Sequence, residues 1–498
     1  MNVNPITRLD YPDPDVIRVE DTYYMVSTTM HFMPGCEILQ SFDLVHWEHA
    51  TYVYETLDHT DAQQLKSGQN IYGQGMWAAS LRYHEGRFYI CFVANDTRKT
   101  YLYTSEKIDG PWKKQLIEGF YHDGSLLFDE DGRNYIVYGN DEIWITELNE
   151  DLTAPKKDGL HRLLVSDHKN PELGYEGSHI QKINGYYYIF LIHSLRDRWM
   201  RTEACFYSDS LEGEFTGGDV LCDDRGYCGQ GVAQGGIVDT PDGKWYAMLF
   251  QDSGAVGRIP ILVPVTWKDH FPFFGQNGHV PEEIEVHSTR PGYIYQPLVG
   301  SDDFCNGLLP RWQFNHDPDP RYYHLDALQG TYTITTREVC TELTHAVNTL
   351  TQRMSYPSCA AEVTVDASAL KEGDVAGLCA LQGCYAAVGI TKHHGKYEVL
   401  MLDKKEDGIL DMTERTVVES HQMDFRLEAD FCNMKDEARC YYRVNKGDWL
   451  PIGTVHKLYF KLDHFTGCRF GLFCYAAEET GGSACFRDFK YYDVDEIS

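Results

Sequence analysis

A short sequence pattern recurs five times in the first 250 residues, and it constrains the fold more than any other feature. Each copy contains an apolar segment, a turn with Gly or Asp, and a second apolar segment around a tyrosine, at Tyr24, Tyr89, Tyr135, Tyr188 and Tyr246. Two such segments joined by a turn are typical of a β-hairpin. The tyrosines lie 46 to 65 residues apart, which exceeds one hairpin and fits a four-stranded propeller blade. We therefore predict a five-bladed β-propeller.

Each copy begins with a residue that can take part in chemistry. Trp77, Asp123, Glu176 and Gln234 each lie 12 residues before the tyrosine of their copy, and Asp13 lies 11 before Tyr24. The first strand of every blade runs along the central channel of a propeller, so equivalent positions near its start meet at one end of the axis. We expect these five residues to form a ring.

Three of the five ring residues are acids. Like charges that lie close together raise one another's pKa and cost free energy, so such a cluster marks a functional site. The alternative is that each acid only caps a turn, because Asp is common beside Pro or Gly in loops. The shared position of Asp13, Asp123 and Glu176 in three blades favours a site.

The overall charge limits the partners of this chain. A net charge of −31 argues against binding to nucleic acid or to an anionic membrane surface, because both need a basic face. Neutral ligands are compatible with this charge, and sugars are the obvious class. The aromatic content of 13% would supply rings that stack on sugar faces.

The N-terminal segment and the cysteines predict a cytoplasmic location. Residues 1–6 contain no basic leader and no long apolar run, so we expect no signal peptide. No segment approaches the 18 apolar residues of a membrane span. The 15 cysteines are scattered and lack a CxxC pair, which is typical of free thiols in a reducing compartment.

The second half of the chain has a different pattern. We expect 261–265 to complete the fifth blade and 268–300 to form a packed linker rich in Pro, Gly, His and Phe. From about Asp302 onward, short alternating segments separated by turns predict an antiparallel sandwich. Only 411–420 suggests a short helix. The predicted class is all-β, with a propeller domain at 1–297 and a β-sandwich domain at 298–498.

Several other chemistries are not indicated. The chain has no HExxH, GxSxG or Walker motif, and the Gly-rich segment 229–235 lacks the dinucleotide fingerprint. No histidine pair has the spacing of a metal site on one element. We expect no cofactor. Paired carboxylates in an aromatic channel instead suggest glycoside hydrolysis.

Six ordered motifs resemble those of glycoside hydrolase family 43. They are Tyr11-Pro12-Asp13-Pro14-Asp15, Met33-Pro34-Gly35, Ser41-Phe42-Asp43-Leu44-Val45-His46-Trp47, Met76-Trp77-Ala78, His122-Asp123-Gly124-Ser125 and Tyr175-Glu176-Gly177-Ser178-His179. The segments 301–304 and 312–316 look like the opening of the concanavalin A-like sandwich of the family's β-xylosidase branch. The resemblance therefore covers nearly the whole chain, and it implies the same five-bladed fold.

The resemblance also implies a reaction and its residues. It implies single-step hydrolysis with inversion, with Asp13 as general base, Glu176 as general acid, and Asp123 as the residue that tunes the pKa of the acid and orients substrate. The expected activity is that of an exo-acting xylan 1,4-β-xylosidase, a non-reducing-end α-L-arabinofuranosidase, or both. An acid at Glu176 needs a raised pKa at neutral pH, and Asp123 is the anion expected to raise it.

Four further residues are candidates for substrate binding. Trp77 and Phe32 are candidate walls of the sugar pocket, although either could be core packing. Arg258 looks like an arginine that faces the acids in xylosidase members of the family. Many members carry a histidine, sometimes associated with a calcium ion in the channel, where this chain has Gln234, so a structural calcium ion is in doubt.

Two other functions stay open at this point. The propeller and sandwich could form a lectin-like module that binds glycans without cleaving them, although binding needs no tuned acid. A five-bladed hydrolase of fructans is the other, but its Asn-Asp-Pro-Asn-Gly, Arg-Asp-Pro and Glu-Cys signatures are absent. The second domain offers surface for a homo-oligomer, and no residue of it can be nominated for the pocket rim.

Overall fold

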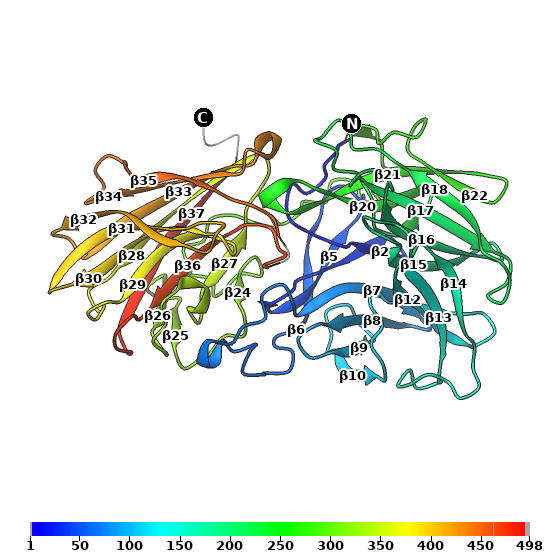
Figure 1. Cartoon of the computed structure of the whole chain (residues 1–498), viewed down its shortest axis with the longest axis horizontal. Coiled ribbons are helices and arrows are strands. Elements are labelled where there is room, and N and C mark those ends of the chain that lie inside the picture. The colour runs from blue at the N-terminus through cyan, green and yellow to red at the C-terminus, as the bar shows by residue number, and fades with distance from the viewer. Residues whose placement is uncertain (1, 462, 494–498) are drawn as a thin grey trace.

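The structure is a computed structural model that describes residues 2–461 and 463–493. Two parts are visible in Figure 1, a propeller built from the N-terminal half and a β-sandwich built from the C-terminal half. All strand pairs named below are antiparallel. The helical segments in the described residues are short 3-10 turns, η1 (Lys66–Gly68), η2 (Gly254–Val256), η3 (Leu343–His345) and η4 (Cys432–Met434). The prediction of an all-β propeller and sandwich is confirmed.

Five four-stranded sheets form the blades, and each begins with one of the predicted hairpins. Blade one contains β2 (Asp15–Val19), β3 (Thr22–Ser27), β5 (Gly35–Ser41) and β6 (Glu48–Tyr54). Blade two contains β7 (Met76–His84), β8 (Arg87–Ala94), β9 (Lys99–Ser105) and β10 (Lys113–Ile117). Blade three contains β11 (Ser125–Phe128), β12 (Asn134–Asn140), β13 (Glu142–Leu148) and β14 (His161–Ser166).

Blades four and five complete the circle. Blade four contains β15 (Glu176–Ile183), β16 (Tyr186–Ser194), β17 (Arg201–Ser208) and β18 (Thr216–Leu221). Blade five contains β19 (Ile237–Asp239), β20 (Trp245–Asp252), β21 (Arg258–Lys268) and β22 (Phe271–Phe274). The first strands of the blades are neighbours around the axis, because β2 contacts both β7 and β19, and β11 contacts both β7 and β15.

Two expectations for local structure were wrong. The fifth blade is completed by β22, which lies in the segment expected to be a linker, while 261–265 lies in its third strand, β21. The expected helix at 411–420 is instead strand β32 (Leu410–Val418). Pairing with β31 (Lys396–Lys404) gives that segment a ladder of backbone hydrogen bonds, so tertiary context overrides its local preference.

The sandwich consists of two large sheets. The eight-stranded sheet has the order β32, β31, β30 (Ala386–His393), β29 (Val375–Leu381), β36 (Arg469–Tyr475), β27 (Leu350–Arg353), β24 (Gln313–Asn315) and β4 (Phe32–Met33). The seven-stranded sheet has the order β25 (Tyr323–Asp326), β26 (Thr331–Thr335), β37 (Ser483–Asp493), β28 (Ser358–Asp366), β33 (Gln422–Asp430), β34 (Glu437–Arg443) and β35 (Leu450–Lys457). A separate pair joins β1 (Asn2–Val3) to β23 (Glu283–Ile284).

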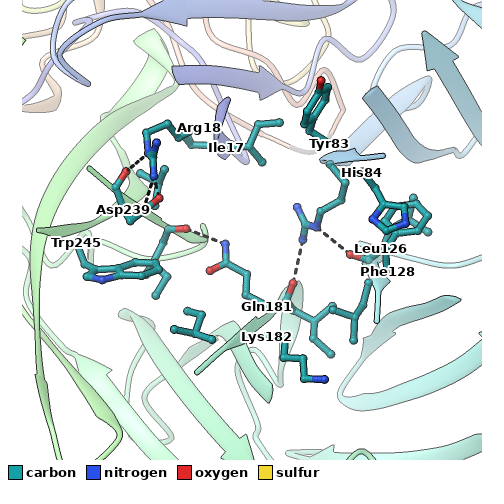
Figure 2. A pocket seen from close by; sticks show the side chains of 17 residues that line it. Ile17, Arg18, Tyr83, His84, Leu126, Phe128, Gln181, Lys182, Asp239 and Trp245 are labelled. Atoms are coloured by element: carbon teal, nitrogen blue, oxygen red, sulfur yellow. Dashed lines mark hydrogen bonds and ion pairs between the residues drawn. The ribbon is translucent and has the colours of Figure 1, made fainter. Parts of the chain in front are cut away.

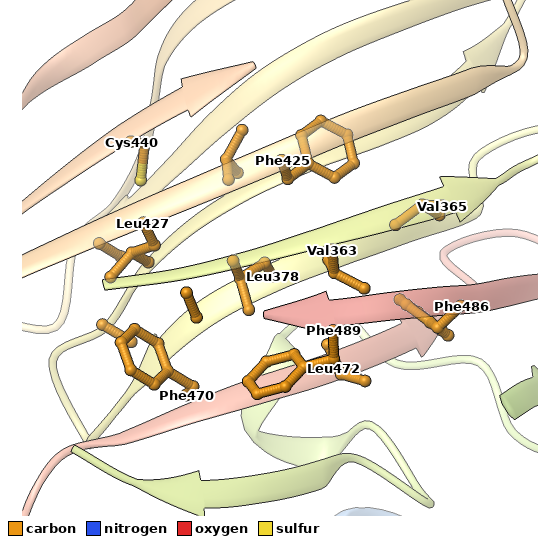
Figure 3. Packing of buried hydrophobic residues seen from close by; sticks show 14 of the residues in the cluster. Val363, Val365, Leu378, Phe425, Leu427, Cys440, Phe470, Leu472, Phe486 and Phe489 are labelled. Atoms are coloured by element: carbon orange, nitrogen blue, oxygen red, sulfur yellow. The ribbon is translucent and has the colours of Figure 1, made fainter. Parts of the chain in front are cut away.

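Alternating side chains from the two sheets form the core of the sandwich. Leu378, Phe470 and Leu472 come from the eight-stranded sheet and meet Phe425 and Leu427 from the seven-stranded sheet (Figure 3). All five are buried, and burying such a side chain contributes about 1.5–3 kcal/mol. The same core cluster includes Ala255 and Val256 of the propeller, so apolar packing is continuous between the two parts.

The propeller and the sandwich share a sheet and a buried polar network. Strand β4 belongs to the loop that follows β3, yet it pairs with β24 at the edge of the sandwich. Arg353 of the sandwich donates Nε–H to the Asp10 carbonyl oxygen at 2.8 Å. Its Nη1 lies 2.9 Å from Glu37 Oε2, with both side chains buried. Movement of one part against the other would break these contacts.

We predict that replacing Arg353 with Met destabilises the protein by about 3–5 kcal/mol, because the buried Glu37 carboxylate loses the cation that compensates it. Urea unfolding measures the change. The double variant Glu37→Gln/Arg353→Met should recover part of this loss, since it leaves no unpaired charge. An Arg353→Met protein as stable as the wild type would show that the ion pair contributes nothing to the junction.

Candidate functional site

The ring residues lie where the backbone departs from regular structure. Asp13, Asp123 and Gln234 precede strands β2, β11 and β19, and their φ angles are 53°, 48° and 61°. Such left-handed conformations cost about 1–3 kcal/mol each in residues other than Gly, and they cluster at functional sites. Trp77 and Glu176 instead occupy register shifts at the starts of β7 and β15. Bulges of this kind redirect side chains next to active sites.

Asp13 is held by a charged and a neutral donor. Arg258 Nη1 lies 2.7 Å from Asp13 Oδ1, and both side chains are buried. Thr28 Oγ1 donates to Asp13 Oδ2 at 2.7 Å. The ion pair and the hydroxyl fix the orientation of the carboxylate, and they satisfy one acceptor position on each of its oxygens.

Asp123 and Glu176 share a third partner, His122. Nε2 of His122 lies 3.5 Å from Asp123 Oδ2 and 3.5 Å from Glu176 Oε2. The N–H of Gly177 donates to Asp123 Oδ2 at 3.0 Å, and Asn140 Nδ2 donates to Glu176 Oε2 at 2.8 Å. The sequence placed His122 beside Asp123 but gave no signal that its ring would face both acids.

The protonation of this group differs from the expectation. Burial raises the pKa of Asp123 to about 6, with the charges of Glu176 and Asp13 adding to the effect. Burial alone would lower the pKa of His122, but the carboxylates of Asp123 and Glu176 raise it to about 9. Burial would also raise the pKa of Glu176, yet the hydrogen bond and charge of His122 lower it. The expected rise at Glu176 was therefore wrong, because His122 supplies a cation.

The structure brings Trp77 and Gln234 to the same end of the channel. The half-buried indole of Trp77 lies edge-on to His122, with ring centroids 5.7 Å apart. Gln234 is buried, and its side chain packs so closely against Gly177 that a Cβ there would lie 2.7 Å from Gln234 Cγ. Gly177, at φ 64°, thus combines a left-handed backbone with a contact that leaves no space for a side chain.

Phe32 lies elsewhere. It is fully buried at the junction, where the Arg469 guanidinium lies 3.5 Å from the centre of its ring. Its backbone pairs with Asn315 of the sandwich. These contacts are those of core packing, the alternative considered for this residue, and a role as a pocket wall stays a prediction.

The sandwich contributes aromatic rings that sequence could not nominate. Phe465 lies with its ring centroid 5.8 Å from that of Trp77 and 4.6 Å from the Arg258 guanidinium carbon. Phe460 lies 5.7 Å from the same carbon. In the sequence these residues are two phenylalanines in a loop far from any motif, so only the packing of the two parts reveals them.

A second buried arginine, Arg201, shares the carboxylate of Asp252 with Arg258. Arg201 Nη1 lies 3.0 Å from Asp252 Oδ2, and Arg258 Nε lies 3.4 Å from Asp252 Oδ1. The Phe250 ring packs against both guanidinium groups, at 5.2 and 4.7 Å. Asp252 therefore holds the two cations apart, and it orients Arg258 toward Asp13.

The site also has the spacing of a cation site. One ligand atom from each of His122, Asp123 and Glu176 lies within 4.8 Å of the others. However, Gly177 and Asn140 already donate hydrogen bonds to the carboxylate oxygens nearest to His122. A protonated imidazole also competes with a metal ion. The residues therefore fit a proton better than a metal.

Chemically, the arrangement provides two carboxyl groups in different environments. One, Asp13, is paired with a permanent cation. The other, Glu176, shares a hydrogen bond with an imidazole that binds a proton near neutral pH. A pair in which one group accepts and the other donates a proton is what glycoside hydrolysis requires.

Comparisons with known proteins agree with this chemistry. Residues 3–272 match the family described as Glycosyl hydrolases family 43, and residues 301–492 match the Beta xylosidase C-terminal Concanavalin A-like domain. A beta-xylosidase of Formosa agariphila is 27% identical over 99% of this chain and 89% of its own length. A non-reducing end alpha-L-arabinofuranosidase of Bacteroides ovatus is 26% identical over 66% of this chain and 63% of its own.

Solved structures extend the comparison. A bifunctional GH43-CE protein of Bacteroides eggerthii superimposes with a TM-score of 0.92 and 42% identity over 99% of this chain. This chain spans 64% of that protein's length. A structure of an engineered GH43 glycoside hydrolase, described as having endo-xylanase and exo-arabinofuranosidase activity, gives a TM-score of 0.87 with 27% identity over 99% of both chains.

We predict that replacing His122 with Asn moves the alkaline limb of the kcat/KM profile to lower pH. In the wild type, the proton that His122 and Glu176 share is lost only near the His122 pKa of about 9. Asn cannot hold that proton, so it must reside on a carboxyl group, whose pKa is lower. The profile from pH 4 to 10 measures the change, with His161→Asn, at an exposed histidine stacked on Trp144, as control. An unmoved or higher limb would contradict the shared proton.

Proposed function

Because the chain belongs to the Glycosyl hydrolases family 43, we propose that it is an exo-acting, inverting glycosidase. Its substrates would be short xylan-derived oligosaccharides that end in β-1,4-linked xylose, α-L-arabinofuranose, or both. The observation that carries the proposal is the contrast between Asp13, which is paired with Arg258, and Glu176, which is hydrogen-bonded to His122. Glycoside hydrolysis needs such a pair of unlike carboxyl groups.

In the proposed mechanism Asp13 is the general base. It takes a proton from a water molecule as the water oxygen attacks the anomeric carbon, while Glu176 gives a proton to the departing glycosidic oxygen. One bond to the anomeric carbon forms as the other breaks on the opposite face, so the configuration inverts. The two carboxyl groups should be roughly 6.5–9.5 Å apart to leave room for that water.

Asp123 and His122 prepare the acid in this proposal. Asp123 accepts the N–H of Gly177, the residue after Glu176, and so fixes the start of β15. His122 lies within 3.5 Å of both carboxylates and holds the proton that Glu176 passes on. Arg258, Trp77 and Gln234 are proposed to contact the terminal sugar, with Phe465 at the rim, and Phe32 is kept as a candidate wall of the pocket.

The names of the relatives support the choice of sugars. They include a beta-xylosidase and a non-reducing end alpha-L-arabinofuranosidase, and others are described as xylosidase/arabinosidase. The two sugars present similar hydroxyl patterns, so one pocket can serve both. A module that only binds glycans is not favoured, because binding requires neither a paired base nor a stored proton.

We predict that Asp13→Ala and Glu176→Ala each lower kcat/KM by about 10²–10⁴-fold or more, the range for loss of a general acid or base. Release of p-nitrophenol from the β-D-xylopyranoside and the α-L-arabinofuranoside measures this, and the ratio of wild-type rates names the preferred sugar. Proton NMR of the first product shows whether the configuration inverts. An inactive wild type would favour glycan binding without hydrolysis, and variants as active as the wild type would contradict the roles proposed for Asp13 and Glu176.

We also propose that hydrolysis needs no metal ion. The middle of the channel already contains a cation, because Arg82 Nη1 lies 2.8 Å from the buried Asp15 Oδ2. His179 Nδ1 lies 3.1 Å from the other oxygen of Asp15. A calcium ion there would have to displace the guanidinium group. The replacement of histidine by Gln234 agrees with a channel that uses arginine instead.

We predict that treatment with EDTA followed by gel filtration leaves kcat/KM and the melting temperature unchanged. The Arg82–Asp15 contact supplies the positive charge that a calcium ion would otherwise bring to the channel. Activity that is lost with EDTA and restored by calcium would contradict this part of the proposal. Arg82→Met serves as a control variant, since it should destabilise the propeller whether or not EDTA is present.

Location and assembly complete the proposal. All 15 cysteines are free, which supports a reducing, cytoplasmic environment. In the described part of the chain, none of the helices is long and apolar enough to cross a membrane.

Exposed apolar side chains on β32 and β35, among them Met412, Val417, Leu450 and Val455, support self-association through the sandwich. The boundary at 297/298 between the two domains likewise stays a prediction.

A further inference from the structure

A second pocket opens at the other end of the propeller channel. Its volume is about 420 Å³, within the usual range for small-molecule sites. It is lined by the far ends of the same inner strands, including 16–18, 82–84, 126–128, 180–183 and 237–239, together with Trp245. The catalytic candidates lie at the starts of these strands. The six residue-to-residue steps from Glu176 to Lys182 span about 20 Å of strand.

A buried polar layer separates this pocket from the acids. Asp15 is fully buried, and it accepts the N–H of Leu81 at 2.7 Å as well as Nη1 of Arg82 at 2.8 Å. Arg82 also donates to Ser125 Oγ and to the Ile180 carbonyl oxygen, at 2.7 and 3.1 Å. A ligand in the far pocket therefore rests on this layer and does not reach the catalytic end.

The charges around the pocket exclude an anionic ligand. The two arginines and one lysine of its described lining are each paired with a carboxylate. Arg18 lies 2.5 Å from Asp239, Arg82 lies 2.8 Å from Asp15, and Lys182 lies 2.6 Å from Asp129. The net charge of −31 further repels anions. A neutral ligand fits the pocket best.

Aromatic rings stand on two sides of the pocket. Figure 2 shows the Trp245 indole on one side and the Phe128 and His84 rings on the other. Phe128 and His84 are stacked, with centroids 4.6 Å apart and an interplanar angle of 6°. Trp267 packs edge-on against Trp245 at 5.7 Å, which holds the indole in place.

Polar groups lie between these walls. Gln181 donates one amide N–H to the Ile237 carbonyl oxygen at 2.7 Å, and this leaves, among the described contacts, its carbonyl oxygen and second N–H for a ligand. The carboxylate of Asp239 is partly exposed. In Figure 2 the Gln181 amide lies in the space between the rings, while the Asp239 carboxylate at the edge of that space accepts hydrogen bonds from Arg18.

We propose that this pocket is a second, non-catalytic site for a neutral saccharide. Sugar rings combine apolar C–H faces, which pack on an aromatic ring, with hydroxyl groups that both donate and accept hydrogen bonds. Trp245 offers such a face, while Gln181 and Asp239 offer partners for the hydroxyls. The inference stands on this pocket alone, whatever sugar the catalytic site takes.

The test is calorimetric titration of the full chain carrying Asp13→Ala, which prevents hydrolysis, with xylotriose and with cellotriose. We expect adding Trp245→Ala or Gln181→Leu to weaken one class of binding site at least tenfold. Trp449→Ala, which removes an indole packed against Arg443 on the sandwich, is the matched control and should change nothing. In the wild-type background, Trp245→Ala should leave kcat/KM for p-nitrophenyl glycosides unchanged.

The outcomes separate this site from the catalytic one. Binding that depends on Trp245, together with a wild-type protein that has no glycosidase activity, would support the second site and contradict the proposed function. Equal binding by all variants would overturn the second site and leave the function intact. If Trp245→Ala fails to fold, Gln181→Leu decides, with a crystal of the Asp13→Ala protein soaked in xylotriose. No density between Trp245 and Phe128, or binding of inorganic phosphate instead of sugar, would also overturn it.

Discussion

The buried carboxylate of Asp10 connects the parts of this protein that must stay in register. One of its oxygens accepts the N–H of Arg258 at 2.8 Å, and the other accepts the N–H of Gly467 at 2.9 Å. Arg258 is the cation on Asp13, and Gly467 follows the sandwich loop that carries Phe465. A single side chain thus fixes the base, its counter-ion and the aromatic rim of the site. Gly257 and Gly467 leave the space it needs, since a Cβ at either would lie within 3 Å of Asp10.

Contacts with this rigid surrounding hold the strained backbone conformations of the site in place. Asp13, Asp123 and Gln234 keep left-handed backbones, which persist only when neighbouring contacts over-determine them. Asp13 is fixed by Arg258 and Thr28, Asp123 contacts the Gly177 N–H, and the Gln234 N–H donates to Glu203 at 2.7 Å. Fixed groups need no reorganisation when charge develops in a reaction.

The two sides of the site carry different charged groups. On one side Arg201, Asp252 and Arg258 alternate in sign, and they present a permanent cation to Asp13. On the other side His122 lies between two carboxylates and keeps a proton near Glu176. The opposite end of the channel has its own aromatic rings and paired charges. The buried Asp15–Arg82 layer separates this end from the acids. The five inner strands therefore serve two ends with different chemistry.

The sequence alone determined the blade count and the ring, because hairpins are local and their repeat places equivalent residues at one end of the axis. It also predicted the sandwich, since alternation of period two needs no knowledge of the partner strand. Only the tertiary structure decided that β22 closes blade five, that 410–418 is a strand and that Phe32 packs at the junction. The same holds for His122, Arg201 and Phe465. Their roles depend on contacts between segments far apart in the chain. Such long-range packing produces no periodic pattern in the sequence from which it could be predicted.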